Sequence, residues 1–312
     1  MMSRERPRVL VVGAGAVGGF YGSLLARAGA QVSVVCRSDA AQIKKTGFQI
    51  CSPLGNDVFH PQAVYCDAAE YPQSPDYLLL TVKVLDNLNR VALIRQAVGQ
   101  HTAIVVLENG IDVESEIASA FPDNEIISAL AFVCVSRTGP GEIDHQAYGD
   151  LTIGGYPQGS SAQVQALAAM FCSQGIACTV SEDVVTARWR KSVWNVPFNS
   201  ASVLAGGATT RQILESSGGE AWVRAVMAEV CAIAAASGHP LPPDVVEKHL
   251  TQTYAMPPYH TSMALDYLHG RPMEVEAILG NAARRARQYG VTAPQIFGLY
   301  ALMKIVQERL VK

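Results

Sequence analysis

The sequence has little charge of either sign and no excess of basic residues. Charged residues make up 16% of the 312 residues, and 24 basic against 27 acidic side chains give a net charge of −3. This balance argues against a broad basic surface, and so against nucleic acid as a partner. Hydrophobic residues reach 49%, which excludes disorder and indicates a large core or a subunit interface, such as that of a homodimer.

Long apolar runs and paired cysteines are also missing. The longest apolar stretches, such as residues 126–135, have about ten residues, against the ~20 that a membrane-spanning helix needs. The start of the chain has no apolar region followed by a small-residue cleavage site. The seven cysteines are scattered without a C-x-x-C pair, so neither a disulfide framework nor a metal site is expected. We therefore expect a cytoplasmic protein with reduced thiols and no membrane contact.

Strand-like and helix-like segments alternate in the first half of the chain. Short apolar runs typical of buried parallel strands occupy residues 8–12, 32–35, 77–82 and 103–107. Repeated units of a strand and a helix indicate a Rossmann-type, doubly wound α/β sheet. Glycines between residues 134 and 155 predict short hairpins.

The second half of the chain reads as helical. Helices are predicted at residues 20–28, 88–98 and 113–120 in the first half, and at 186–204, 221–236, 273–288 and 294–310 in the second. We place the domain boundary near residue 182. The prediction is an α/β domain over residues 1–182 followed by an all-α domain over 183–312.

A glycine pattern joins the first predicted strand to the first predicted helix. It consists of Gly13, Ala14, Gly15, Ala16, Val17 and Gly18. In G-x-G-x-x-G, the first glycine permits the tight turn and the second lets the backbone approach a pyrophosphate. The third lets the helix pack closely on the strand. Because the pattern stands inside a β-α-β unit, it predicts a dinucleotide site rather than a merely glycine-rich turn.

Residues after three predicted strands refine this prediction. No acidic residue follows the second strand until Asp39, whereas Arg37 suits the 2′-phosphate of NADP, so NADP(H) is favoured over NAD. Lys83 and Asn109 follow two further strands, at the sheet edge where ligands of such folds bind. A surface lysine and an Asn-Gly turn are the alternative explanations of these two residues.

Three polar side chains are predicted to share one face of a helix in the second half. Lys191, Asn195 and Asn199 are spaced at i, i+4 and i+8 among apolar neighbours. A structural hydrogen-bond network would explain them, and so would a site that reduces a carbonyl group. In the second case the lysine protonates the developing alkoxide while the amides orient the ligands. Pro197 should kink this helix.

A second group of polar residues follows further along the chain. The Ser262 hydroxyl is able to donate to a carboxylate, and Glu274 or Glu276 is able to accept from a substrate hydroxyl group. An acidic residue in the first turn of a helix is also explained by the helix dipole alone.

Over nearly its whole length, the sequence resembles the ketopantoate reductase family. The similar motifs stand in the family's order: GAGAVGGFYG at 13–22, TVK at 81–83, NGID at 109–112, RTGPGEIDHQAYGDLTIG at 137–154, RWRKSVWNVPFN at 188–199, and HTSM at 260–263 with Glu274 beyond it. The resemblance implies reduction of 2-dehydropantoate to (R)-pantoate with NADPH, a step of pantothenate and coenzyme A synthesis. It also implies a Rossmann domain joined to a helical domain, an architecture shared with 6-phosphogluconate dehydrogenase.

The resemblance further implies roles for individual residues. Lys191 corresponds to the family's general acid, and Glu274 to the carboxylate that holds substrate hydroxyl groups. Asn195, Asn199 and Ser262 correspond to substrate-binding residues, with Ser262 on the substrate carboxylate.

For the cofactor, the resemblance implies that Lys83 and Asn109 bridge it to the substrate, and that Arg37 lies near the adenosine 2′-phosphate. The sequence departs from familiar members at Tyr259 and at Thr209-Thr210, close to the expected substrate pocket.

Three alternatives stay open at this point. The first is a reductase of another branched 2-oxo acid with the same residues. The second is a relative of 6-phosphogluconate or β-hydroxyacid dehydrogenases, against which the spacing of Ser262 and Glu274 argues. The third is a sensor that binds NADPH without turnover.

Overall fold

The computed structural model describes residues 6–310, which form two compact units. The first unit contains the chain up to Val82 together with residues 89–108 and 113–184. The second contains residues 185 onward and two short segments, Lys83–Leu88 and Asn109–Asp112. Residues 83 and 109 therefore belong to the helical unit, although in the chain they come shortly after strands of the first unit.

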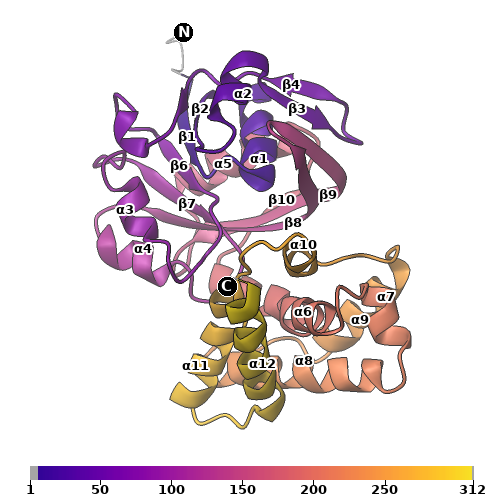
Figure 1. Ribbon diagram of the computed structural model, residues 1–312. Coiled ribbons are helices and arrows are strands. Elements are labelled where there is room, and N and C mark those ends of the chain that lie inside the picture. Colours follow the sequence, from indigo (N-terminus) through magenta and orange to yellow (C-terminus); the bar gives the residue numbers. More distant parts are fainter. Residues whose placement is uncertain (1–5, 311–312) are drawn as a thin grey trace. The chain divides into compact units, whose positions relative to one another are not determined.

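The first unit is built on one ten-stranded sheet (Figure 1). Its strands are β1 (Arg8–Val12), β2 (Gln31–Val35), β3 (Phe48–Cys51), β4 (Asp57–Phe59), β5 (Val64–Tyr65), β6 (Tyr77–Leu80), β7 (Ala103–Leu107), β8 (Ile126–Gly139), β9 (Glu142–Gly155) and β10 (Cys178–Val180). The order is β4-β3-β9-β8-β7-β6-β1-β2-β5, with β10 beside β9. From β8 to β5 all neighbours are parallel, which confirms the doubly wound α/β prediction.

The order of the strands reverses next to β1. Chain order runs from β1 outward to β2 on one side, while β6 and then β7 lie on the other. In open α/β sheets, ligands bind at the carboxyl ends of the strands at such a reversal point. The glycine pattern after β1 and the residues Thr81-Val82 after β6 therefore occupy the position where a nucleotide is expected.

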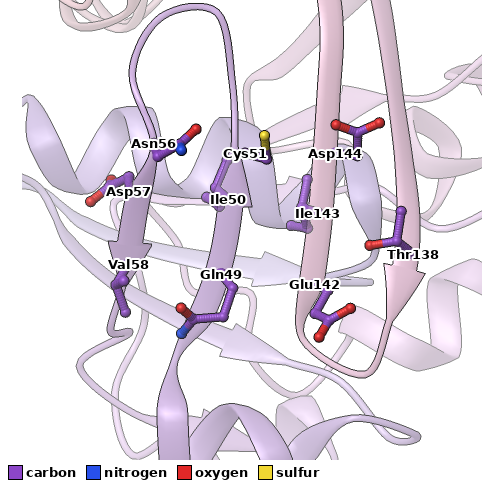
Figure 2. Close-up of a pocket in the computed structure, with 10 residues that line it drawn as sticks. All are labelled: Gln49, Ile50, Cys51, Asn56, Asp57, Val58, Thr138, Glu142, Ile143 and Asp144. Atoms are coloured by element: carbon purple, nitrogen blue, oxygen red, sulfur yellow. The ribbon is translucent and has the colours of Figure 1, made fainter.

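The β8–β9 hairpin is longer than the short hairpins predicted. Each strand has 14 residues, and the pairing shifts register between Phe132 and Val133, between Cys134 and Val135, and near Gly139. The first of these shifts passes over Gly149, which like Gly141 has a positive backbone φ, so these glycines lie within one bent hairpin instead of ending several. β9 also pairs with β3, and a cavity of about 590 Å³ lies over β3, β4 and the end of the hairpin (Figure 2).

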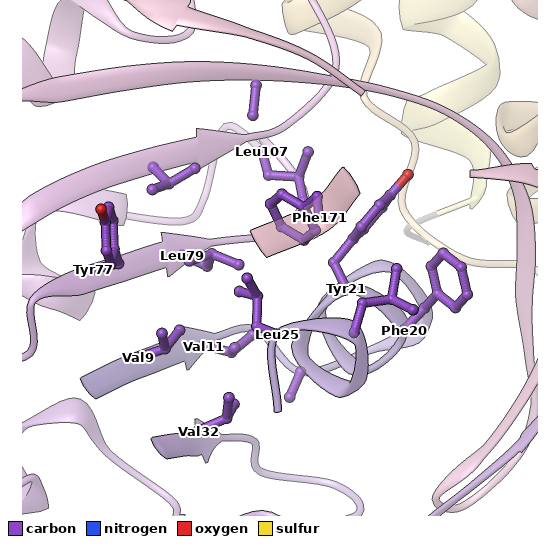
Figure 3. Close-up of a cluster of buried hydrophobic side chains, with 14 of the residues drawn as sticks. Val9, Val11, Phe20, Tyr21, Leu25, Val32, Tyr77, Leu79, Leu107 and Phe171 are labelled. Carbon is purple, nitrogen blue, oxygen red and sulfur yellow. The ribbon is translucent and has the colours of Figure 1, made fainter. Parts of the chain in front are cut away.

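Helices cover the sheet on both faces, as parallel strands require. They are α1 (Ala16–Arg27), α2 (Ala40–Thr46), the short 3₁₀ helix η1 (Ala68–Glu70), α3 (Arg90–Ile94), α4 (Ser115–Ala120) and α5 (Ala162–Cys172). Phe20 and Tyr21 of α1 and Phe171 of α5 pack on alternate residues of β1, β2, β6 and β7 (Figure 3). Each such fully buried side chain contributes about 1.5–3 kcal/mol, which fixes α1 against the strand that ends in the glycine turn.

The second unit is helical, as predicted. Its elements are α6 (Val184–Leu204), α7 (Thr210–Glu215), α8 (Gly219–Ala236), α9 (Val245–Ala255), α10 (Ser262–Leu268), the π-helical segment η2 (Glu276–Gly280), α11 (Asn281–Gln288) and α12 (Pro294–Leu310). α6 runs through Pro197 without a break. A core of side chains from α6, α8, η2, α11 and α12 holds these helices together. Among residues 6–310, no helix is both long and apolar enough to cross a membrane.

Candidate active site

The glycine turn of the first unit is fixed by close packing. Gly13 has φ +93°, and a Cβ there would lie 2.5 Å from Cγ1 of Val82. The Thr81 hydroxyl donates to the Gly13 carbonyl at 2.8 Å, and a Cβ on Gly18 would collide with this same hydroxyl. Both glycines are therefore required by the protein's own packing, between the ends of β1 and β6.

Gly15 differs from these two glycines. Its φ is −83°, and a Cβ there would meet nothing closer than the Gly13 carbonyl oxygen at 3.9 Å. Packing within the protein thus does not demand glycine at this position, whereas close approach of a ligand to the backbone does. The first turn of α1 has neither a side-chain cap nor an acidic residue, so its N–H groups and positive potential suit a pyrophosphate. These residues fit a dinucleotide.

The end of β2 presents one exposed cation. Arg37 is exposed, while Asp39, two residues further on, is buried. The Asp39 carboxylate accepts from Arg137 at 2.9 Å and from the backbone N–H of Gly141 at 3.2 Å. The acidic residue nearest to β2 is therefore turned toward the β8–β9 hairpin.

Three of the predicted residues form a hydrogen-bonded group in the second unit. Lys191 Nζ, on α6, donates to Asn109 Oδ1 at 2.8 Å, and Asn109 Nδ2 donates to Glu274 Oε2 at 3.4 Å. The other oxygen of Glu274 accepts from the Val84 backbone N–H at 3.2 Å. We call Lys191, Asn109 and Glu274 the polar triplet. It brings together residues 165 positions apart in the chain.

Burial shifts the pKa values of Lys191 and Glu274. The pKa of Lys191 is lowered to about 8, first by the loss of water on burial and then by the Arg188 charge, whereas the charge of Glu274 acts to raise it. Burial raises the pKa of Glu274, against the hydrogen bonds from Val84 and Asn109 and the charge of Lys83. A lysine with a pKa lowered in this way is suited to give up a proton during a reaction.

The turn that carries Asn109 is shaped by its contact with the π-helical segment. The Ile111 N–H donates to the Ala277 carbonyl at 3.0 Å. Gly110, at φ +108°, packs so closely that a Cβ would lie 2.5 Å from the same carbonyl oxygen. The Asn-Gly pair is thus more than a common turn, because glycine is what lets Asn109 reach Lys191 and Glu274.

We expect Gly110→Ala to lose activity and stability together. Its Cβ would meet the Ala277 carbonyl in a left-handed backbone, at a cost of roughly 1–3 kcal/mol in unfolding free energy. Gly290→Ala is the matched control, since Gly290 has φ +66° but open space around its Cβ. Urea unfolding and steady-state turnover should show a larger loss for Gly110→Ala in both. Equal turnover in the two variants would contradict the positioning of Asn109 by this contact.

Lys83 lies in the same unit but makes a different set of contacts. Its Nζ is 2.7 Å from Asp266 Oδ1 and donates to the Pro272 carbonyl at 3.2 Å. The ion pair joins Lys83 to α10, and the next residue, Val84, holds Glu274. The structure therefore places Lys83 beside the polar triplet without a direct contact to Lys191.

Of the remaining predicted residues, Asn199 forms hydrogen bonds within the part of the chain that the structure describes, whereas the side chains of Asn195 and Ser262 do not. Asn199 donates to the Asn195 carbonyl at 3.0 Å and accepts from the Met263 N–H at 3.3 Å, which anchors the start of α10. The Asn195 amide and the exposed Ser262 hydroxyl form no hydrogen bond within residues 6–310. These two side chains are the ones free to bind a ligand.

The sequence reasoning missed Thr81 in the first unit and two residues in the helical unit, Arg188 and Asp266. Arg188 is buried, donates to the Gly110 carbonyl at 3.2 Å and influences Lys191. Its position three residues before Lys191, on the same helix face, could have indicated it. Asp266 follows Ser262 by one helical turn, so the same kind of spacing could have indicated Asp266. Thr81, which belongs to the TVK motif, stabilises the glycine turn through its hydrogen bond to Gly13.

Two predicted features have a structural explanation instead. Glu276, offered as an alternative to Glu274, binds Arg284, Tyr300 and Lys304. Thr209 caps α7 in a reciprocal arrangement with Gln212. The acidic candidate beside Lys191 is therefore Glu274.

Family models match both halves of the chain. Residues 9–158 match the family described as ketopantoate reductase PanE/ApbA, and residues 183–307 match its C-terminal model. A 2-dehydropantoate 2-reductase of Nostoc sp. is 35% identical over 304 residues, covering 96% of this chain and 95% of that protein.

Solved structures agree with these matches. The crystal structure of 2-dehydropantoate 2-reductase from Methylococcus capsulatus is 52% identical, with a TM-score of 0.92 and 98% of each chain covered. A D-mandelate dehydrogenase, solved with NADH and anilino(oxo)acetate, has a TM-score of 0.88 at 22% identity, covering 98% of this chain and 100% of its own. That likeness shows the fold alone.

Proposed function

Because the chain belongs to the ketopantoate reductase family, we propose that this oxidoreductase converts 2-dehydropantoate to (R)-pantoate with NADPH, in pantothenate and coenzyme A synthesis. The observation that carries the proposal is the polar triplet, in which a lysine with a lowered pKa is aimed by Asn109 beside a buried carboxylate. Reduction of a carbonyl group needs one proton at the carbonyl oxygen, and we propose that the ammonium group of Lys191 donates it.

The glycine turn and Arg37 would hold the cofactor. Backbone groups of Gly13, Ala14, Gly15, Ala16, Val17 and Gly18 suit the pyrophosphate, and Arg37 suits the 2′-phosphate. Lys83 and Asn109 are proposed to reach both ligands. When bound, NADPH supplies a hydride to C2 of the 2-oxo acid.

The helical unit supplies the remaining chemistry. Protonated Lys191 donates its proton to the carbonyl oxygen as that oxygen gains negative charge, while Asn109 keeps the ammonium group in place. Glu274 accepts hydrogen bonds from the substrate hydroxyl groups. Ser262, whose side chain has unused hydrogen-bonding capacity, holds the substrate carboxylate. Asn195 and Asn199 line the substrate pocket, and Asn199 also anchors α10.

A substrate panel tests this function. NADPH oxidation is followed by absorbance with 2-dehydropantoate and with other branched or aromatic 2-oxo acids, and each reaction is repeated with NADH. The proposal predicts the highest kcat/KM for 2-dehydropantoate with NADPH. Turnover of only another acid would keep the fold and the Lys191 chemistry and would contradict the assigned substrate. Nucleotide binding without any turnover would indicate a sensor.

Compartment and assembly complete the proposal. All seven cysteines are free thiols, which supports a reducing, cytoplasmic compartment. A homodimer stays a prediction, for which the exposed side chains of Leu302 and Ile305 on α12 offer an apolar surface.

A further inference from the structure

We propose that Arg137 determines specificity for a 2′-phosphorylated nucleotide by neutralising Asp39. This inference rests on the proposed use of NADPH. It concerns only the first unit, at the point where β2 ends beside the β8–β9 hairpin. No motif in the sequence assigns a role to Arg137, which lies about a hundred residues away from Arg37 in the chain.

The first step of the argument is the charge at the end of β2. Arg37 offers one positive charge to a phosphate, but Asp39 stands only two residues later with a carboxylate. Left to itself, this pair would be neutral overall, and the carboxylate would repel a phosphate dianion. Like charges brought together at a binding site weaken binding.

The second step is the geometry of Arg137. One nitrogen of its guanidinium lies 2.9 Å from both oxygens of Asp39, and the same nitrogen donates to the Ser38 hydroxyl at 3.2 Å. The N–H of Gly141 completes the hydrogen bonding of the carboxylate at 3.2 Å. The Asp39 side chain is 9% exposed, whereas Arg137 remains 42% exposed. The carboxylate is covered and the guanidinium is left at the surface.

The third step is the consequence for a ligand. Arg37, Ser38, Asp39 and Arg137 together carry one net positive charge and a hydroxyl group next to it. Such a surface favours a phosphate ester over a ribose hydroxyl. Thr138 and Glu142, which follow Arg137 on the hairpin, line the cavity over β3 and β4 (Figure 2).

Binding of two adenosine nucleotides tests this proposal without turnover. Adenosine 2′,5′-bisphosphate and adenosine 5′-monophosphate are titrated by calorimetry into wild-type protein and into Arg137→Met, Arg137→Lys and Asp39→Asn/Arg137→Met. Wild-type protein should prefer the bisphosphate. Arg137→Met should lose that preference by about tenfold or more, since the negative charge of Asp39 is then no longer neutralised. Arg137→Lys should retain most of it.

The double variant decides how Arg137 acts. Because Asp39→Asn removes the charge that Arg137 neutralises, it should restore the preference in the Arg137→Met background. Failure of this rescue, or an unchanged preference in Arg137→Met, overturns the proposal while leaving NADPH use intact. Absence of any preference in the wild type overturns NADPH use as well.

Two controls exclude trivial causes. The monophosphate affinity should stay constant in every variant, which reports on an intact glycine turn. Arg27→Met removes an exposed arginine from the last turn of α1, about 16 Å along the helix from its first residue. It should leave the preference unchanged.

Discussion

We expect Lys191→Met to lower kcat by about a thousandfold, within the roughly 10²–10⁴-fold range of general acid catalysis. The physical reason is the position of Lys191, whose Nζ is held at 2.8 Å by Asn109 beside buried Glu274. Methionine keeps the apolar stem and removes the proton donor. NADPH affinity, measured by fluorescence titration without substrate, should remain unchanged because the glycine turn is untouched.

Arg190→Met is the matched control for this variant. Arg190 is an exposed basic residue next to Lys191 on α6, so the substitution removes the same charge from the same helix. It should retain wild-type kcat. Parallel losses of kcat and NADPH affinity in Lys191→Met would contradict its assignment as the general acid.

The second large effect is expected for Glu274→Gln. The carboxylate accepts hydrogen bonds from Val84 and Asn109, and hydrogen bonds to charged groups are worth roughly 1.5–3 kcal/mol each. We expect kcat/KM for the 2-oxo acid to fall by about a hundredfold. The alkaline limb of the kcat profile should also move to lower pH, because Glu274 raises the pKa of Lys191.

Glu276→Gln separates this role from a structural one. Glu276 lies two residues away but pairs with Arg284 and Lys304. Its replacement should lower the melting temperature and leave the pH profile where it is. A pH profile that does not move in Glu274→Gln would show that Glu274 has no electrostatic influence on Lys191.

Local patterns sufficed to predict the strand and the helix on either side of the glycine pattern. The glycine pattern, the apolar strand before it and the helix after it are contiguous in the chain, so their order implies their geometry. The predicted strand at residues 103–107 matches β7, and the helix at 294–310 matches α12. Buried parallel strands and amphipathic helices carry their signals within a few residues.

Features that depend on distant contacts were less predictable. The helix predicted at residues 273–288 begins later and opens with a π-helical segment, where the Ala277 carbonyl receives Ile111. The helix predicted at 88–98 is confined to α3, which Asn89 caps through the Ala92 N–H. In the first case a distant hydrogen-bond partner and in the second a capping side chain sets where the helix begins, and hydrophobic periodicity indicates neither of them.

The candidate site shows the same division. Spacing on one helix placed Lys191, Asn195 and Asn199 on a shared face, but it did not distinguish their tasks. Asn199 turns out to be committed to the backbone of α10. The Arg137–Asp39 pair joins residues 98 positions apart, and no local sequence pattern predicts such an interaction.

The pH dependence of kcat tests the central claim most directly, namely that Lys191 gives the proton to the substrate. Its pKa is lowered to about 8, and only the protonated form acts as an acid. With saturating NADPH and 2-dehydropantoate, kcat should be level below this pH and fall tenfold per unit above it. A kcat that stays constant from pH 7 to 10, roughly the span over which Lys191 loses its proton, would contradict the account.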